Sequence, residues 1–548
     1  MCRDWQTAMH CSLQLCHIVI FIGHQVLNMK KKPLFWKMSS NRKGKSAARR
    51  EPSWAVSLVP FAVLTLSLVV VIKIFGADAL SGGSQVCLLL ASAVTAAISM
   101  ALYGNSWENL ENCILDNIRS VGSAILILLL IGAIAGTWMV SGVVPSMICY
   151  GMKIIFPPVF LAAACAISAL VSVMTGSSWT TIATIGVALI GIGTAQGFDP
   201  GWTAGAIISG AYFGDKVSPL SDTTVLASSS TGTPLFTHIR YMMITTIPSL
   251  CIALVIFLTA SLMHHGADSA RTAEFSGALE SSFRITPWLM AVPVLTGILI
   301  VKKVPAILTL FCAAVMAAAA ALVFQPQAIW AVANPGESIA SFQGLSFWDA
   351  CKGTAVTFYG STGIMTGNEA IDSLISTRGM TGMLNTIFLI ICSVTFGGVL
   401  AGSGMLRSLT EIFARLAHRA VTLVGSTVGT GLLCNMVTGD QYISIILTSS
   451  LYKRLFEQKG YEKRLLSRSV EDSATVTSVL IPWNSCGMTQ ATVLKVPTLD
   501  YLPYCFFNII SPLMSVCIAA VGYKIFRTHP ERPSATDSGS PVQEGPRP

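Results

Sequence analysis

A polar stretch, GAYFGDKVSPLSDTT at residues 210–224, interrupts an apolar part of the sequence and carries groups suited to chemistry. It places two acids, Asp215 and Asp222, and one cation, Lys216, around Pro219. Proline has no backbone N–H, so a helix breaks here and the carbonyl of Asp215 loses its hydrogen-bond donor. In an apolar environment that oxygen needs a new partner. Such a break among side-chain oxygens predicts a site for a hard cation such as Na⁺, by the preference that gives Mg²⁺ and Ca²⁺ oxygen ligands.

A second stretch, residues 466–487, has the same character, because Pro482 releases the carbonyl of Ser478 beside further polar side chains. The side chains that we expect to bind an ion or a proton are Asp215, Ser218, Ser221, Asp222, Thr223, Thr224, Asp472, Thr475, Thr477, Asn484 and Ser485. The hydroxyl groups have an alternative role, since Ser and Thr also cap broken helices.

Capping explains the acids of the first stretch less well, because a carboxylate at mid-membrane costs about 2.5–3.5 kcal/mol even on the lenient insertion scale. We expect Asp222 to be the main group that gains and loses a proton, with Asp215 as a second candidate. Lys216 has two interpretations. It either neutralises Asp215 as a buried pair or binds the anionic group of an organic solute.

Two related segments, TGSSWTTI at 175–182 and TGDQYISI at 438–445, are candidates for hairpin tips. Their tip residues are Thr175, Gly176, Ser177, Ser178, Thr438, Gly439 and Asp440. Each segment is either a plain turn between helices or a tip whose amides and hydroxyls meet substrate. Asp440 stands where the first segment has Ser177, which suggests that one tip binds a cation and the other closes the site.

The elements that position these groups are predicted to be membrane-spanning helices. Hydrophobic residues make up 53% of the 548-residue chain and charged residues only 11%, whereas soluble domains are roughly 25% charged. Runs long enough to cross about 30 Å of hydrocarbon as a helix occur at residues 54–75, 84–103, 121–140, 236–263, 304–324, 383–401 and 504–526. The chain is therefore predicted to be an all-α polytopic membrane protein.

The sequence also repeats itself with a spacing of 263 residues, as from Thr175 to Thr438 and from Pro219 to Pro482. Residues 453–468 contain six Lys or Arg, whereas the equivalent residues 190–205 contain none. Short loops rich in Lys and Arg stay in the cytoplasm, so equivalent loops are predicted on opposite sides of the membrane. We expect two inverted-topology repeats, each with about five clear spans plus broken or re-entrant helical segments, as in many secondary transporters.

The predicted organisation has five parts: an N-terminal cytoplasmic tail (1–50), repeat 1 (51–264), an external linker (265–286), repeat 2 (287–527) and a disordered tail (528–548). Residues 30–50 contain nine Lys or Arg and no acid. Such a patch next to a span indicates the cytoplasmic side rather than nucleic acid. For residues 1–37 we expect a misassigned start, with Met38 as the initiator, and we identify no cleavable signal peptide. Both termini are placed in the cytoplasm.

Four segments carry a resemblance to a known family: 131–148, 175–193, 208–227 and 466–487. They resemble the NhaC-type sodium/proton antiporters, and the likeness extends over roughly residues 54–526. It implies a secondary antiporter of the bacterial inner membrane, without a covalent cofactor, whose paired hairpins and broken helices enclose a central site. Some members of this family exchange organic acids such as malate and lactate.

The hypothesis is that Na⁺, or Li⁺, and H⁺ compete for one carboxylate site, so that alternating access gives exchange. The alternative is a Na⁺- or H⁺-coupled exchanger of organic acids of the malate and lactate type. An enzyme is not expected, because no GxSxG or HExxH motif occurs. The expected partners are Na⁺, H⁺ and the lipid bilayer, with no nucleic acid. Whether two copies form a homodimer is left open.

Overall fold

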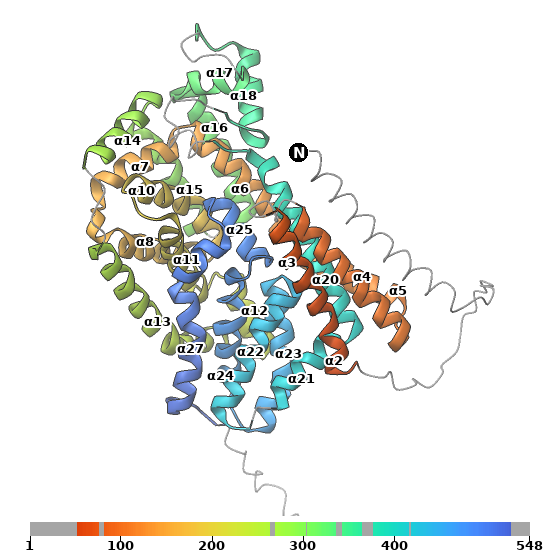
Figure 1. The fold of residues 1–548 in the computed structure, drawn as a ribbon. Coiled ribbons are helices and arrows are strands. Elements are labelled where there is room, and N and C mark those ends of the chain that lie inside the picture. Colours follow the sequence, from red (N-terminus) through yellow and green to blue (C-terminus); the bar gives the residue numbers. More distant parts are fainter. Residues whose placement is uncertain are drawn as a thin grey trace, which may run out of the picture. The chain divides into compact units, whose positions relative to one another are not determined.

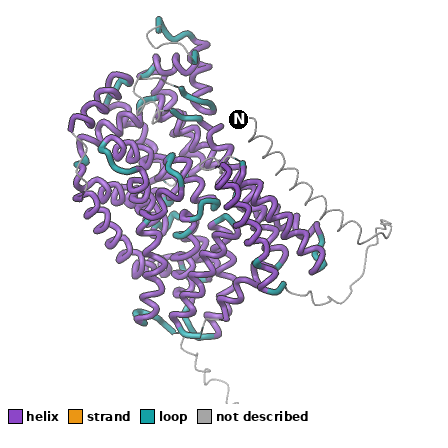
Figure 2. Tube along the Cα trace, viewed as in Figure 1, coloured by secondary structure: helices purple, strands orange, loops and turns teal. Residues whose placement is uncertain are grey.

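The structure is a computed structural model that describes residues 52–75, 82–263, 269–302, 304–335, 342–363, 376–415 and 418–527. The predicted tails at residues 1–50 and 528–548 lie outside the described residues. Within the described part the chain consists of helices and loops (Figure 2). One isolated β-bridge joins Tyr461 and Arg527. The prediction of an all-α fold is confirmed.

The helices of the first half and of the connection to the second are α2 (Trp54–Ser57), α3 (Val59–Phe75), α4 (Gly83–Tyr103), α5 (Trp107–Ser120), α6 (Gly122–Val140), α7 (Val143–Ile154), α8 (Phe160–Thr175), α9 (Ser178–Thr181), α10 (Val187–Ala195), α11 (Pro200–Val217), α12 (Asp222–Thr231), α13 (Leu235–Met263) and α14 (Ser269–Ser282). A π-helical segment, Ile182–Gly186, joins α9 to α10. The predicted linker therefore contains a helix, α14.

The helices of the second half are α15 (Ala291–Val301), α16 (Ala306–Phe324), α17 (Pro326–Ala333), α18 (Phe347–Tyr359), α20 (Leu384–Ser403), α21 (Met405–Arg415), α22 (Ala420–Thr438), α23 (Gln441–Gln458), α24 (Lys463–Val470), α25 (Ser485–Leu494), α26 (Thr498–Tyr501) and α27 (Phe506–Val521). A π-helical segment, Glu471–Thr475, and a 3₁₀ turn, Ser478–Leu480, lie between α24 and α25.

Nine helices in the described part of the chain are long and apolar enough to cross a membrane, or up to eleven if two bent helix pairs each count as one span. One bent pair is Thr498–Tyr504 with Phe506–Val521, which turns by 53° within the predicted span 504–526. Many of the outward-facing side chains are large and apolar, as expected for contact with lipid. The prediction of a multi-pass membrane protein is confirmed.

Both predicted helix breaks are present. Helix α11 ends at Val217 and α12 begins at Asp222, so Pro219 lies in the connection. In the second half, Pro482 lies between the 3₁₀ turn and the start of α25 at Ser485. In each half, therefore, a helix stops and restarts around a proline.

The backbone repeats with nearly the same spacing as the sequence. Left-handed residues occur in pairs: Gly142 with Gly404, Gly176 with Gly439, Gly197 with Gly460, and Gly232 with Lys495. Lys495, at a φ of 56°, is one of two non-glycine residues with positive φ in the described chain. A lysine pays steric strain in this conformation, so the shared turn, rather than local residue preference, accounts for its backbone.

Packing also couples the two halves. Helix α4 of the first half packs on α20 of the second, and α16 of the second half packs on α6 of the first. Near the candidate site, α11 lies close along α8 (Figure 1). Side chains at Gly210 or Gly214 would collide with the backbone of α8, so glycine permits this approach. The opposite insertion of the two halves stays a prediction.

Candidate functional site

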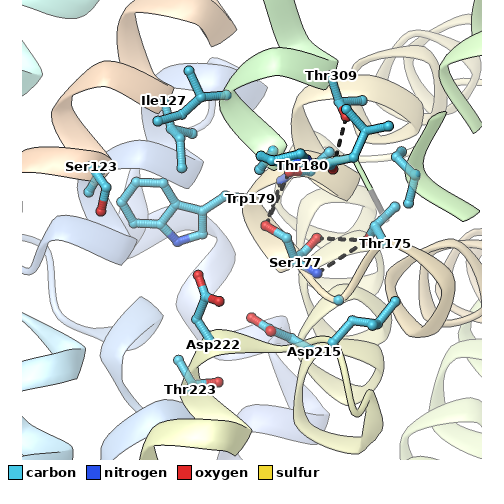
Figure 3. A pocket seen from close by; sticks show the side chains of 18 of the residues that line it. Ser123, Ile127, Thr175, Ser177, Trp179, Thr180, Asp215, Asp222, Thr223 and Thr309 are labelled. Carbon is cyan, nitrogen blue, oxygen red and sulfur yellow. Dashed lines mark hydrogen bonds between the residues drawn. The ribbon is translucent and has the colours of Figure 1, made fainter. Parts of the chain in front are cut away.

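A cavity of about 410 Å³ lies where the first hairpin tip, the first helix break and the start of α23 meet. Figure 3 shows its polar side chains at close range. The predicted site residues that line it are Thr175, Gly176, Ser177, Asp215, Asp222 and Thr223. The remaining walls come from the start of α6, from the end of α15 with the loop and first turn of α16 that follow it, and from α23. Five segments of both halves therefore enclose one space.

Asp215 is held in place from two directions. Its Oδ2 accepts a hydrogen bond from Ser178 Oγ at 2.7 Å, and its Oδ1 accepts one from Ser221 Oγ at 2.6 Å. Ser178 belongs to the hairpin tip and Ser221 to the break, so the carboxylate joins the two elements. The side chain is only 5% exposed. Hydrogen bonds from hydroxyls are stronger when the acceptor is a charged carboxylate than when the acceptor is neutral.

Asp222 has a different environment. It is the first residue of α12, its side chain is exposed toward the cavity, and its carboxylate makes no hydrogen bond or ion pair with a described residue. In Figure 3 the carboxylates of Asp222 and Asp215 face the same space on one side of the Trp179 ring. The N-terminal end of a helix favours a negative charge at this position. Asp222 is thus an unpaired acid open to the cavity.

The hydroxyl groups at the break serve mainly as caps. Thr224 Oγ1 donates to the carbonyls of Asp215 at 3.1 Å and Lys216 at 3.0 Å. Ser218 Oγ donates to the carbonyl of Val173 at 2.8 Å, and Ser221 Oγ caps α12 by accepting from the amide of Thr224. The carbonyl that Pro219 releases is therefore bonded to Thr224. Because Ser218 and Thr224 lie behind the wall, capping accounts for them without an ion.

Lys216 does not pair with Asp215. Its ammonium group instead forms a buried ion pair with Asp472 of the second half, and both side chains are fully buried. Thr245 Oγ1 and Ser511 Oγ donate to the same Asp472 oxygen at 3.2 and 3.0 Å. Because its ammonium group binds Asp472, the interpretation of Lys216 as a partner of Asp215 is wrong. Neither Lys216 nor Asp472 lines the cavity.

The second half repeats the scaffold with different side chains. Asp440 Oδ1 accepts from the amide of Ile443 at 3.0 Å and caps α23, and Ser485 Oγ donates to its Oδ2 at 3.3 Å. Asn484 caps α25 by accepting from the amide of Cys486 at 3.0 Å. The predicted site residues of the second half do not line the cavity: these are Thr438, Gly439, Asp440, Asp472, Thr475, Thr477, Asn484 and Ser485.

The sequence interpretation missed several side chains at or near the site. Trp179, Gln441 and Tyr442 line the cavity, and the first two directly follow the predicted tips. Glu471 is fully buried, and neither of its carboxyl oxygens has a hydrogen-bond partner among the described residues. Its position next to Asp472 was visible in the sequence. It lies in the π-helical segment Glu471–Thr475, all of whose residues are buried, and the residue pattern reveals neither the π-helix nor the burial.

Comparison with known proteins identifies the family. The model of the Na⁺/H⁺ antiporter family matches residues 35–229 and 210–523. The Na(+)/H(+) antiporter NhaC of Bacillus subtilis (strain 168) is 34% identical over 435 residues, which cover 79% of this chain and 91% of the relative. The chain belongs to the Na⁺/H⁺ antiporter family. The resemblance seen in the sequence is therefore confirmed.

Other relatives in this family carry different names at similar identity. The Malate-2H(+)/Na(+)-lactate antiporter of Bacillus subtilis (strain 168) is 34% identical and covers 78% of this chain and 86% of its own length. The arginine/ornithine antiporter ArcD of Halobacterium salinarum is 33% identical, and the alignment covers 88% of this chain and 95% of that relative. Among solved structures, Neisseria gonorrhoeae MtrF aligns with 86% of this chain and 95% of its own at 13% identity and a TM-score of 0.32.

Proposed function

We propose that the chain exchanges Na⁺ for H⁺ at the cavity between the first hairpin tip and the first helix break, with Asp222 as the shared carboxylate. Family membership supports sodium/proton antiport in general. The observation that carries the assignment to this site is the open, unpaired carboxylate of Asp222 beside Asp215, whose position Ser178 and Ser221 fix.

The two acids have complementary roles in this proposal. Asp222 releases a proton to the cavity and then attracts Na⁺, with Asp215, Ser177 and Thr223 offering further oxygens from the walls. Hard cations prefer such oxygens. When Asp222 takes up a proton again, the site loses the charge that held Na⁺. Na⁺ and H⁺ exclude each other at this site. If the site changes from one side of the membrane to the other only with Na⁺ bound or with H⁺ bound, the result is exchange rather than leak.

Alternating access requires two states of similar energy, which two inverted repeats would supply by exchanging conformations. The distribution of basic residues supports a cytoplasmic location for residues 453–468 and for both termini, in a protein of the bacterial inner membrane. Epitope tags inserted at Gly197 and at Lys459 test this topology. If the repeats are inverted, the two tags lie on opposite sides of the membrane. Tags that are accessible from the same side would contradict inversion.

The alternative, exchange of an organic acid, has support from the name of the malate and lactate relative. The cavity offers it little, because none of the described side chains that line it is basic. Lys216, the predicted partner for a carboxylate solute, is engaged by Asp472. We therefore place Na⁺/H⁺ exchange first.

The test uses everted membrane vesicles with a pH-sensitive dye. The wild type is expected to give Na⁺-dependent dequenching without any organic solute, and Asp222→Asn is expected to abolish it at equal expression. Glu111→Gln is the matched control, because Glu111 is an exposed acid of α5 that does not line the cavity. Exchange at the wild-type rate by Asp222→Asn would remove this residue from the mechanism.

A further inference from the structure

Glu471 is a buried acid that the exchange mechanism above does not use. Its side chain is fully buried, and neither carboxyl oxygen has a hydrogen-bond partner among the described residues. The equivalent residue of the first half, 263 positions earlier, is Ile208, which is also fully buried. The repeated fold is therefore satisfied by an apolar side chain at this position. A carboxyl group there costs free energy unless it finds a partner, which indicates a purpose other than packing.

Two hydroxyl groups surround this carboxyl group. Thr475 lies four residues further along the same π-helical segment, and its buried hydroxyl has no hydrogen-bond partner among the described residues. The hydroxyls of Thr475 and Thr223 both lie close enough to interact with Glu471. Neither of them forms a hydrogen bond with it. Carboxylate and hydroxyl oxygens are the ligands that hard cations prefer, so this group of oxygens suits a small ion such as Na⁺.

The backbone of the π-helical segment is held in place from two sides. Asn435 of α22 donates a hydrogen bond to the carbonyl of Ala474 at 2.6 Å. Asn508 of α27 donates one to the carbonyl of Val476, directly after the segment, at 2.9 Å. π-Helical turns interrupt regular hydrogen bonding and frequently occur at functional sites. The position of Glu471 is thus fixed by both neighbouring helices.

Thr223 connects Glu471 to the cavity. It lines the cavity, and Figure 3 shows it beside Asp222. Its hydroxyl lies 2.9 Å from that of Ser221, which in turn donates to Asp215. The π-helical segment packs against α12, the helix that carries Thr223. One hydroxyl group therefore separates Glu471 from the cavity, so the cavity gives an ion a route to it.

The charges near Glu471 are balanced in two states. Lys216 and Asp215 both act on its carboxyl group. The ammonium group of Lys216 binds Asp472, and the guanidinium of Arg468 lies 4.0 Å from the other oxygen of that acid. With Glu471 neutral, these groups carry two positive and two negative charges. With Glu471 charged, one Na⁺ restores the balance and supplies the partner that a buried carboxylate needs.

We propose that Glu471, Thr475 and Thr223 form a second Na⁺ site, separate from Asp222 and reached through the cavity. The proposal rests on the proposed function for the route by which Na⁺ enters, and it adds a site to that mechanism. Na⁺ replaces the proton of the neutral Glu471 carboxyl group, and this proton passes to water in the cavity.

The test counts bound sodium ions. Binding of ²²Na⁺ to purified protein is measured at saturation by equilibrium dialysis at fixed pH. We expect two Na⁺ per chain for the wild type, one for Glu471→Gln and one for Asp222→Asn. Glu111→Gln, the exposed acid of α5, is the control and is expected to keep both. Two ions retained by Glu471→Gln would overturn the proposal.

A variant without a change of charge tests the ligand set. Thr475→Val removes one oxygen but keeps the volume, so the Kd of the second site is expected to rise about tenfold. Thr475→Ser keeps the hydroxyl and is expected to restore the affinity. Thr246→Val is the matched control, because Thr246 is also a fully buried threonine whose hydroxyl has no partner among the described residues. If Glu471→Gln is not monodisperse, Thr475→Val takes its place, and an unchanged Kd for both ions contradicts the site.

The same counts distinguish failure of the inference from failure of the proposed function. One Na⁺ that only Asp222→Asn abolishes overturns the inference and keeps the proposed function. One Na⁺ that only Glu471→Gln abolishes supports the buried site and refutes Asp222 as the sodium ligand. One Na⁺ that both variants abolish means a single shared site and contradicts a separate second one. Absence of Na⁺ binding by the wild type refutes both.

Discussion

The two hairpin tips share one backbone design but carry different chemistry. In the first, Thr175 Oγ1 bonds the carbonyl of Ser177 at 3.2 Å, and in the second, Thr438 Oγ1 bonds the carbonyl of Asp440 at 3.0 Å. Ser177 and Asp440 each cap the helix that follows. Gly176 and Gly439 have φ values of 67° and 64°. The scaffold is therefore repeated closely, down to its hydrogen bonds.

The acids, by contrast, are placed differently in the two halves. In the first half they lie at the break, as Asp215 and Asp222, whose equivalents 263 residues later are Ser478 and Ser485. In the second half the acid lies at the tip, as Asp440, and its carboxylate is used by a helix cap and by Ser485. The two halves thus share the same backbone arrangement but differ in the positions of their acids. Because of this difference, one carboxylate without a partner among the described residues, that of Asp222, lines the cavity.

The largest departure from symmetry is the buried pair of Lys216 with Asp472, whose equivalents are Val479 and Ser209. Removing one partner of a buried ion pair leaves an uncompensated charge and costs about 3–5 kcal/mol. We expect this loss of unfolding free energy for Asp472→Asn, measured in mixed micelles with increasing SDS. The double variant Lys216→Met/Asp472→Leu is expected to recover only part of it, because the fully buried Arg468, whose Nε lies 4.0 Å from Asp472 Oδ2, also loses its partner. A larger loss in the double variant than in Asp472→Asn would contradict the interpretation that the unpaired charge of Lys216 causes the cost.

A second prediction compares equivalent positions in the two breaks. Asp215→Asn removes the charge that Ser178 and Ser221 stabilise, and hydrogen bonds to charged groups contribute about 1.5–3 kcal/mol. The Na⁺ concentration for half-maximal exchange is expected to rise by about tenfold or more. Ser478→Ala, at the equivalent position of the second break, is expected to change it less than about twofold. A comparable rise for both variants would mean that the two breaks bind the ion together.

The third prediction concerns the tips. Asp440→Ala and Ser177→Ala each remove an N-cap, and loss of such a cap costs about 1 kcal/mol. Both variants are expected to lower the unfolding free energy by that amount, with Asp440→Ala retaining Na⁺/H⁺ exchange in vesicles. If Asp440→Ala abolishes exchange as fully as Asp222→Asn does, the second tip is part of the ion site and the asymmetry described above is incorrect.

Sequence predicted well what depends on local chemistry. The breaks at Pro219 and Pro482 follow from the missing proline N–H, and the tips follow from a Thr-Gly pattern in which glycine permits a positive φ. Capping is one of the two roles that the sequence predicts for Ser218 and Thr224. The breaks, the tips and the bond from Thr224 to the carbonyl of Asp215 involve residues close together in the sequence. Ser218, by contrast, bonds the carbonyl of Val173, which lies 45 residues away along the chain.

Sequence failed where partners are distant along the chain. Lys216 pairs with Asp472, 256 residues away, although Asp215 is its neighbour in sequence. The cavity walls combine Trp179 of the first half with Tyr442 of the second, and an aromatic residue in an apolar chain gives no sign of such a role. Helix packing decides that Asp222 is exposed to the cavity and that Asp215 is buried. Residue patterns do not predict such packing.

The smallest expected effect on stability concerns Glu471, and it distinguishes this acid from its neighbour Asp472. Asp472 has hydrogen bonds and an ion pair, whereas Glu471 is fully buried without a hydrogen-bond partner among the described residues. A buried carboxylate without a partner is very costly, so Glu471 is expected to be a neutral acid that Gln replaces with little change in volume. Glu471→Gln should lower the unfolding free energy by no more than about 1 kcal/mol, because replacing a polar group that has no partner loses little. A loss as large as that of Asp472→Asn would mean that Glu471 carries a charge balanced by a group elsewhere in the chain, and the contrast between the paired and the unpaired acid would then not hold.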